Sequence, residues 1–347
     1  MINILDLVES EGLKAKLRVA APDEWIDAAK ALHYLPVMYS APMIDYQIEY
    51  WRGNGWSVED LSLVFCRDGK SLGIWPLTLS THRETGKRVL GLAGGDLLPP
   101  LFHRSVARRT LKSMSASCLN IATECSRQFE SAGWASEEGF TNGDGGISDW
   151  QQKALQSGAS VVLGHDLFAD VTRSMADIKS GLRKSYKSLL SSGNRLWTVQ
   201  VMNQANAAIW DEFRSLHISV AGRVTRSLES WRLQHEAIAS GDAFFVYLTG
   251  GDGRMVGGGL FYMTKDEGSY VVGAYDRNLF DKPLGHVVQY RALEEMKKHG
   301  VSWYRLGARS YPSDSPAPSL KELSIAEFKQ GFSSHVFPRY WVRYGQQ

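Results

Sequence analysis

The feature that most constrains the fold is an approximate internal repeat of apolar runs joined by Asp-Gly turns. In the first half, LSLVFCRDGKSLGIWPLTLSTHRETGKRVLGLAGGD (residues 61–96) predicts three strands with turns at 68–69 and 84–87. In the second half, FFVYLTGGDGRMVGGGLFYMTKDEGSYVVGAYD (residues 244–276) predicts the same order, with turns at 252–253 and 266–268. Short apolar runs bounded by Asp-Gly are typical of β-hairpins. Each half is therefore expected to contain a three-strand meander.

Helices flank both meanders in the same order. One is expected after each meander, at residues 106–129 and 286–299. Another precedes each meander and carries EWIDAAKALH (24–33) or IWDEFRSLH (209–217). Repeats this long indicate two copies of one α/β domain rather than a solenoid. The polar, glycine-rich stretch at 140–160 is the expected seam, so the predicted domains are residues 1–160 and 161–347.

Composition narrows the function classes. The chain has 347 residues, of which 44% are hydrophobic and 22% charged, as in ordinary globular proteins with buried cores. A net charge of +2 implies no general attraction to nucleic acid, so DNA is not an expected partner. The nine histidines and three cysteines show no metal-binding spacing, so no metal is expected. No apolar run approaches the roughly 20 residues that span a bilayer, and the N-terminal stretch is too acidic for a signal peptide. A cytoplasmic protein is expected.

A row of basic residues marks the start of the second half. Ser174 followed by Asp177 is typical of a capped helix N-terminus, and Gly193 is the expected end of that helix. Lys179, Arg183 and Lys187 then fall four residues apart on one helix face. Two interpretations stay open: a solvated basic face, or a cradle that neutralises phosphate groups on a substrate.

The stretch YVVGAYDRNLFDKPLGHVVQYRALEEMKKHG (residues 270–300) places a helix directly after a strand and a short turn. Lys282, Gly285 and His286 lie around the start of this helix. A helix N-terminus carries free N–H groups, which can be capped locally or can bind an anion. The residues alone do not choose between these two roles.

Three stretches together resemble the FemAB-like branch of the GNAT acyltransferase superfamily, in which two GNAT-type domains are fused. They are DVTRSMADIKSGLRKSYKSLLSSG (170–193), GAYDRNLFDKPLGHVVQYRALEEMKKHGVSWYRLG (273–307) and LSIAEFKQGFSS (323–334). The resemblance covers most of the chain and is clearest from about residue 166 to 344. It implies an α/β (α+β) fold of two tandem GNAT-like domains, each a mixed, mainly antiparallel sheet flanked by helices.

The resemblance also implies a donor site in the second domain. In GNAT proteins the turn and helix start bind the pyrophosphate of acyl-CoA, and the preceding strand points N–H groups at the reacting carbonyl. The corresponding residues here are Val271, Val272, Gly273, Lys282, Gly285 and His286. The usual turn pattern has a second small residue where this chain has Val287, and a bulky residue there would keep the backbone farther from a diphosphate.

The same resemblance implies a catalytic lysine, and nearby residues supply the candidates for a base and for acceptor binding. Lys329, in EFKQGF, corresponds to a lysine at the reaction centre that meets the negative charge developing on the carbonyl oxygen. Its alternative is a solvated lysine at a turn. Asp276, Tyr304 and Glu327 are the candidates for a base that deprotonates the amine, and nothing in their spacing chooses among them. Lys179, Arg183 and Lys187 would bind a phosphate-carrying acceptor.

The first domain has GGDLLPPLF (94–102) where the second has the donor turn, and two prolines exclude a similar helix start. This domain is therefore expected to be acceptor-side or structural, and the second domain to bind donor and catalyse transfer. The leading prediction is a cytoplasmic N-acyltransferase that moves an acyl group from acyl-CoA to an amine of a cell-envelope or glycan precursor, or of a similar metabolite. Two alternatives stay open: an aminoacyl-tRNA-dependent aminoacyltransferase of the FemAB type, with tRNA as a partner, and a non-catalytic GNAT-like binding module in polysaccharide assembly.

Overall fold

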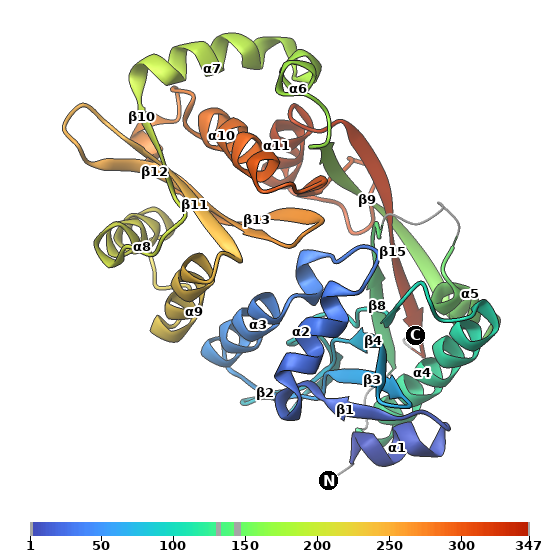
Figure 1. Ribbon diagram of the computed structural model, residues 1–347. Helices are drawn as coiled ribbons and strands as arrows, with labels where there is room; N and C mark the ends of the chain where they lie inside the picture. Colours follow the sequence, from blue (N-terminus) through green and yellow to red (C-terminus); the bar gives the residue numbers. More distant parts are fainter. Residues whose placement is uncertain (1–2, 130–132, 142–146, 346–347) are drawn as a thin grey trace. The chain divides into compact units, whose positions relative to one another are not determined.

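A computed structural model describes residues 3–129, 133–141 and 147–345 of the chain (Figure 1). It divides into two compact units, one formed by Met1–Leu163 with Pro338–Gln347 and the other by Gly164–Phe337. The chain passes between the units within strands β9 (Ser160–Asp170) and β15 (His335–Tyr344). No helix in the described part of the chain is both long and apolar enough to cross a membrane.

The first unit is built from short strands and helices. Its elements are α1 (Ile4–Ser10), β1 (Ala15–Leu17), η1 (Arg18–Ala20), α2 (Pro22–Lys30), η2 (Val37–Tyr39), α3 (Ala41–Gly53), β2 (Trp56–Asp60), β3 (Leu63–Arg67), β4 (Lys70–Trp75), β5 (Thr78–His82), β6 (Arg88–Gly91), β7 (Leu101–Phe102), α4 (Arg108–Gln128), β8 (Trp134–Glu138) and α5 (Asp149–Gln156). One sheet has the order β1-β3-β4-β7, a second has β2-β5-β6, and β8 pairs antiparallel with the end of β15.

The predicted turns of the first half are confirmed, but its continuous meander is wrong. Asp68 and Gly69 both have positive φ, 51° and 74°, as a two-residue hairpin turn between β3 and β4 requires. After β4 the chain leaves the sheet at Pro76, and β5 and β6 form a hairpin in the other sheet. Proline lacks the N–H that a continued ladder needs, which accounts for the break. The helix predicted at 106–129 is observed as α4.

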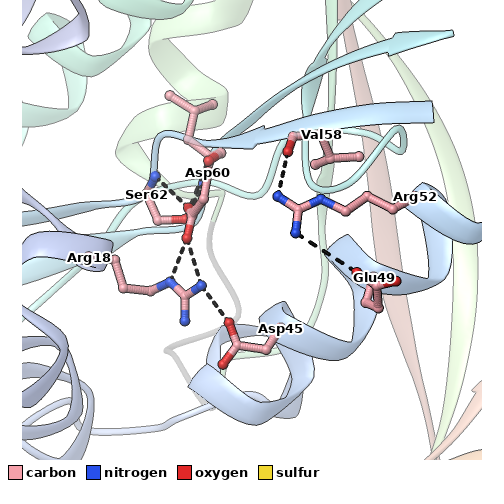
Figure 2. Close-up of polar contacts among 8 residues, drawn as sticks. Arg18, Asp45, Glu49, Arg52, Val58, Asp60 and Ser62 are labelled. Atoms are coloured by element: carbon pink, nitrogen blue, oxygen red, sulfur yellow. Dashed lines mark hydrogen bonds and ion pairs between the residues drawn. The ribbon is translucent and has the colours of Figure 1, made fainter. Parts of the chain in front are cut away.

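A buried ion-pair cluster fixes η1 in the first unit (Figure 2). The Arg18 guanidinium donates to Asp60 Oδ2 from Nε (2.9 Å) and Nη2 (2.6 Å), and Nη2 also donates to Asp45 Oδ1 (2.6 Å). Asp60 Oδ1 in turn accepts from the Ser62 N–H. Arg18 and Asp60 are buried, whereas the Asp45 side chain is 46% exposed. This cluster therefore joins η1 to β2 and α3 through a largely desolvated pair.

The second unit is one twisted sheet with helices on both faces. Besides β9 and β15 it contains α6 (Met175–Gly181), α7 (Lys184–Leu196), β10 (Thr198–Met202), α8 (Ala207–Ala221), α9 (Leu228–Ala239), β11 (Ala243–Thr249), β12 (Met255–Met263), β13 (Glu267–Tyr275), η3 (Arg277–Leu279), α10 (Leu284–Lys298), β14 (Trp303–Ala308) and α11 (Leu320–Gln330). Strands β10-β11-β12-β13-β14-β9 are neighbours in that order, and only β13 and β14 are parallel among these pairs.

Alternating side chains of the sheet supply two apolar layers. Phe244 and Phe261 are fully buried in the cluster that includes α7 and α10, and Phe245 packs with the aromatic residues Trp210 and Phe213 of α8. Successive residues of a strand face opposite sides, so the run Ala243–Thr249 is apolar throughout because both faces are covered. Figure 1 shows α7 and α10 on one face and α8 and α9 on the other. The meander β11-β12-β13 predicted for this half is confirmed, as is the helix α10.

The helix predicted from Ser174 to Gly193 is wrong in two respects. Ser174 does cap its start, but α6 ends at Gly181, and Leu182 and Arg183 are extended before α7 begins. The Arg183 N–H donates to the Gly331 carbonyl instead of continuing the helix. Gly193 does not end α7, which runs on to Leu196.

Candidate functional site

The site begins where β13 and β14 separate. Their parallel pairing covers only Glu267–Ser269 opposite Trp303–Arg305, so the rest of β13 has no partner on that side among the described strands. On its other side, Val271 is an extra residue: Leu260 pairs with Val272 and Phe261 with Tyr270. A bulge of this kind bends a strand and redirects its backbone groups. The end of β13 consequently lines an opening beside the start of α10.

The start of α10 has no side-chain cap. Its N-cap residue is Pro283, which makes no side-chain cap hydrogen bond, and of the first-turn N–H groups that of Leu284 donates to the Lys282 carbonyl (2.9 Å). The dipole of the helix and these N–H groups together favour an anion at this position. Gly285, in the first turn, lets the Phe328 ring pack closely against this turn: a β-carbon at this residue would lie 3.2 Å from that ring.

A cavity of about 930 Å³ lies at this opening within the second unit. It is lined by parts of β13, η3, α10 and α11 and by the end of α8: Val220, Tyr270, Gly273, Ala274, Tyr275, Arg277, Phe280, Lys282, Leu284, Gly285, His286, Gln289, Lys321, Ser324, Ile325, Phe328 and Lys329. This volume is in the upper range for small-molecule sites. The lining contains four cations and, among these residues, no carboxylate. Its chemistry suits an anionic ligand with an apolar portion.

Lys329 enters the cavity from the last turn of α11. Its Nζ lies 3.0 Å from the place a β-carbon of Gly307 would occupy, and Gly307 has φ +106° at a bulge in β14. A larger residue at 307 would meet both the backbone strain and the ammonium. Burial lowers the pKa of Lys329, the carboxylate of Asp166 raises it, and the Arg305 guanidinium lowers it. The Lys329 ammonium is therefore partly desolvated, and the fully buried carboxylate of Asp166 favours its charged form.

Asp166 and Arg305 form the charged pair behind Lys329. Arg305 donates to Asp166 Oδ2 from Nη2 (2.7 Å) and Nε (3.1 Å). They extend from the neighbouring antiparallel strands β9 and β14, in which Asp166 pairs with Ala308, next to Gly307. A two-point Arg–carboxylate contact fixes the orientation of both groups.

His286 lies in an aromatic environment at the start of α10. Its ring makes edge-to-face contacts with Tyr186 (centroids 4.5 Å apart) and Phe328 (5.0 Å). Burial, with a smaller contribution from Arg183, lowers the pKa of His286 to about 4. The imidazole that lines the cavity is consequently neutral at physiological pH.

The three candidate bases do not line the cavity. Tyr304 is fully buried and donates to Gln289 Oε1, and burial raises its pKa well above the ordinary value, so it stays protonated. The Asp276 carboxylate pairs with Arg254 (3.2 Å) and accepts from the Asn278 N–H. Glu327 is an exposed partner of Arg183. The structure thus brings Lys329 to the cavity without these three groups.

Of the six donor-site residues named from the sequence, four line the cavity: Gly273, Lys282, Gly285 and His286. Val271 and Val272 do not, although both lie in the same strand. Val287, the bulky residue of the turn, points away: its Cγ2 lies 2.3 Å from where a Gly193 β-carbon would be, against α7. The Val287 side chain therefore packs between two helices and does not extend into the cavity.

The basic row is not a single helix face. Lys179 is exposed on α6, Arg183 sits at the break and pairs with Glu327 (3.1 Å), and Lys187 donates to the Ser180 carbonyl (3.0 Å). None of the three lines the cavity. The prediction that they share one helix face is wrong because α6 ends before Arg183.

Sequence reasoning missed much of the apolar lining, including Val220, Phe280 and Ile325, as well as the cations Arg277 and Lys321. The sequence does carry a signal for these residues, since an apolar residue stands within two positions of a lysine in FDK (280–282) and in LK (320–321). Among the described residues, no group of three or more His, Cys, Asp or Glu side chains is placed to hold a metal ion.

Comparison with known proteins agrees with this architecture. Residues 176–315 match the acetyltransferase (GNAT) domain family. The crystal structure of FemX is similar over 92% of this chain and 95% of its own, with a TM-score of 0.69 and 12% identity. A tandem GNAT protein from the clavulanic acid biosynthesis pathway is similar over 95% of this chain and 98% of its own (TM-score 0.52, 13% identity).

A third similar structure is the C-terminal domain of a protein named as a lysylphosphatidylglycerol synthetase from Agrobacterium fabrum. It covers 94% of this chain and 93% of its own length, with a TM-score of 0.57 and 14% identity. No curated protein sequence matches the chain. Residues 176–315 thus match the GNAT domain family, and the chain shares its fold with FemX and with a tandem GNAT protein.

Proposed function

We propose that the second unit is an N-acyltransferase that binds an acyl-CoA donor in the cavity and transfers the acyl group to an amine. The observation that supports this most is the convergence of three features on one cavity. These are the uncapped start of α10, the unpaired edge of β13 and four cations without a lining carboxylate. The first and third suit a diphosphate, and the second offers backbone N–H groups to a carbonyl.

In the proposed reaction the amine nitrogen attacks the thioester carbonyl, the C–N bond forms and the C–S bond breaks. The thiolate leaves, and the proton lost by the amine returns to it. Negative charge builds on the carbonyl oxygen before the thiolate leaves, and the Lys329 ammonium meets it. His286 lines the cavity with a neutral imidazole, but its pKa of about 4 makes it a weak acceptor for this proton.

Transfer from an aminoacyl-tRNA is the second candidate. Its support is the likeness in fold to FemX and to the protein named as a lysylphosphatidylglycerol synthetase, whose name describes an aminoacyl group carried by a lipid. An aminoacyl ester would use the same carbonyl and amine chemistry, with a ribose oxygen as the leaving group. The same two likenesses support a cell-envelope precursor as the acceptor. Lys179, Arg183 and Lys187 remain proposed contacts for its phosphates, and the first unit a proposed acceptor-side part.

The test begins with binding and continues with rate. Calorimetry with coenzyme A, then with a charged tRNA, identifies the donor. Release of thiol from acetyl-CoA in the presence of a panel of amino sugars and amino acids then measures transfer. Lys329→Ala should fold normally, keep coenzyme A affinity within a few-fold and lose about 10²- to 10³-fold in rate. Lys184→Ala, which removes an exposed lysine at the start of α7, is the matched control and should keep the wild-type rate.

Lys329→Arg separates charge from shape, since it keeps the cation but places it on a longer, planar group. Partial activity in this variant would support a role for positive charge. Near-normal transfer by Lys329→Ala would remove the residue from the reaction centre. Tight donor binding with no transfer to any amine would favour the non-catalytic binding module.

A further inference from the structure

Three polar and aromatic residues gather at the end of β14 in the second unit. The strand stays paired with β9 beyond its last residue, since the Arg309 N–H donates to the His165 carbonyl (2.8 Å). The Tyr311 ring contacts both side chains: its centroid lies 4.4 Å from Arg309 Cζ and 5.2 Å from the centroid of the His165 ring. We call Arg309, His165 and Tyr311 the Arg309 cluster. None of the three lines the donor cavity.

The Arg309 cluster contains two buried polar atoms, Arg309 Nε and His165 Nδ1, that have no hydrogen-bond partner among the described residues. Arg309 Nη1 donates to the Ser310 carbonyl (2.6 Å). The acid closest to Arg309 along the chain is Asp314, and its carboxylate accepts from the Tyr311 N–H (2.7 Å) instead of pairing with the guanidinium. A buried polar atom without a partner is costly, so these two atoms indicate a missing group that bonds to them.

The cluster lies on the face of the sheet that α11 covers. Leu167, two residues after His165 in β9, is buried in the core against which Phe328 of α11 packs. Alternate residues of a strand share a face, so His165 points to the same side as Leu167. Opposed residues of antiparallel strands also share a face, which places Arg309 beside His165.

The same face brings the cluster close to the proposed reaction centre. Arg309 stands two residues beyond Gly307, a separation of about 7 Å along an extended strand. Lys329 Nζ lies 3.0 Å from the place a β-carbon of Gly307 would occupy. A molecule whose amine reacts beside Lys329 therefore has the Arg309 cluster within reach of its other groups.

A carboxylate is the group that fits the open edge of this guanidinium. Nε and Nη2 of an arginine form a planar fork that matches two carboxylate oxygens, and the Tyr311 ring holds the guanidinium plane by stacking. His165 Nδ1 can donate to the same carboxylate in the tautomer that carries its proton on that nitrogen.

We propose that the Arg309 cluster binds a carboxylate of the amine acceptor and thereby selects amines that carry this group. The proposal rests on the proposed function in treating Lys329 as the reaction centre. Binding of the carboxylate itself needs neither donor nor transfer.

Binding measured without a donor gives the first test. Ligand-observed NMR titrations of the full chain use glycine, 4-aminobutyrate and 6-aminohexanoate, each beside its amide. The wild type should bind at least one acid about 10- to 100-fold more tightly than the matching amide, as expected for a hydrogen-bonded charged group. Arg309→Gln should abolish this preference, whereas Arg309→Lys, which keeps the charge without the fork, should retain part of it.

Two results of these titrations would overturn the proposal. They are equal binding of acid and amide by the wild type, and a full preference for the acid in Arg309→Gln; either would leave water as the partner of the buried atoms. Binding of 3-aminopropyl phosphate as tight as that of the preferred acid would overturn the choice of a carboxylate. Melting curves check folding, and Arg309→Lys carries the test if Arg309→Gln does not fold.

Transfer kinetics with acetyl-CoA give the second test. Arg309→Gln should raise KM for the preferred acid about 10- to 100-fold and leave both its kcat and the KM for the amide within a few-fold. A fall in kcat for acid and amide alike, with KM unchanged, would show a structural effect and overturn the proposal. Arg195→Gln is the matched control, since it removes an exposed arginine in the last turn of α7, and it should behave as the wild type.

The outcomes separate this proposal from the proposed function. Selective binding of the acid that Arg309→Gln loses, without transfer to any amine, would overturn the proposed function alone. Lys329-dependent transfer that treats acid and amide alike would overturn the carboxylate site alone.

Discussion

Gly193 offers a direct test of how α7 positions the start of α10. An alanine β-carbon at this residue would lie 2.3 Å from Val287 Cγ2 and 3.2 Å from Pro283 Cγ and O. Pro283 is the N-cap residue of α10, and Val287 lies one turn further along it. Gly193→Ala should therefore move the first turn of α10, which lines the cavity through Leu284, Gly285 and His286.

Two opposing effects set the size of the stability change. Alanine in place of glycine inside a helix is favourable by about 1 kcal/mol. Carbon atoms normally stay about 3.5–4.0 Å apart, so the 2.3 Å approach demands a shift of more than 1 Å from two packed helices. Overpacking of this kind costs about 1–3 kcal/mol. The net expectation is a loss of up to about 2 kcal/mol and a fall in melting temperature of up to roughly 8 °C.

Urea unfolding and coenzyme A calorimetry on the wild type, the two single variants, the double variant and a control measure both the change in stability and the change at the cavity. Val287→Ala alone should cost about 1.6 kcal/mol, from two buried methyl groups. In the double variant the clash is absent. Its loss of unfolding free energy should therefore be smaller, by about 1 kcal/mol or more, than the sum of the losses in the two single variants. Gly181→Ala at the end of α6 is the control, because its nearest neighbour would be 3.8 Å away. A Gly193→Ala protein more stable than the wild type by the full helix-propensity gain of about 1 kcal/mol, or additive single losses, would refute the packing argument.

Two further predictions concern charge. In the first unit, Asp60→Asn should lower the free energy of unfolding in urea by about 3–5 kcal/mol, because it leaves buried Arg18 without its main partner (Figure 2). Asp45→Asn, at a half-exposed site, should lower it by about 1 kcal/mol or less. Equal losses in the two variants would contradict this prediction. The pKa of His286 is about 4 in the folded protein and about 6.5 in the unfolded chain. Its contribution to the free energy of unfolding is therefore fully present above pH 6.5 and is lost as the pH falls to 4, a total loss of up to roughly 3 kcal/mol. His286→Gln should flatten that part of the stability profile without abolishing it, since His217 also has a pKa of about 4.

Local signals predicted the elements that are stabilised locally. The Asp68-Gly69 turn needs only two residues that accept positive φ, and the sequence supplies them. The Ser174 cap is likewise settled within one turn, by the Asp177 N–H that its side chain accepts. The helix at 286–299 has its own apolar stripe and appears as Leu284–Lys298. In each case the partners lie a few residues apart in the chain.

The missed features depend on partners distant in sequence. The helix break at Leu182 and Arg183 is stabilised by the Gly331 carbonyl, which accepts the Arg183 N–H. The lining of the cavity by Gly273, but not by Val271 or Val272, follows from the bulge opposite Leu260 and Phe261. A bulge changes which residues of a strand share a face, and no composition signal marks it in GSYVVGAY. For the same reason the candidate site could be located from the sequence, but its lining could not.

Val287 and Gly193 are best understood as a pair. The GNAT turn pattern that this chain resembles has a small residue at position 287, and a valine there would be expected to keep the backbone away from a diphosphate. The structure directs that valine toward α7, where the residue opposite it is a glycine. The small residue that the turn lacks is thus present on the facing helix, and the first-turn N–H groups of α10 remain uncapped beside Gly285. The departure from the pattern therefore weighs less against an acyl-CoA donor than the turn sequence alone suggests, and coenzyme A binding by the Val287→Ala variant should equal that of the wild type.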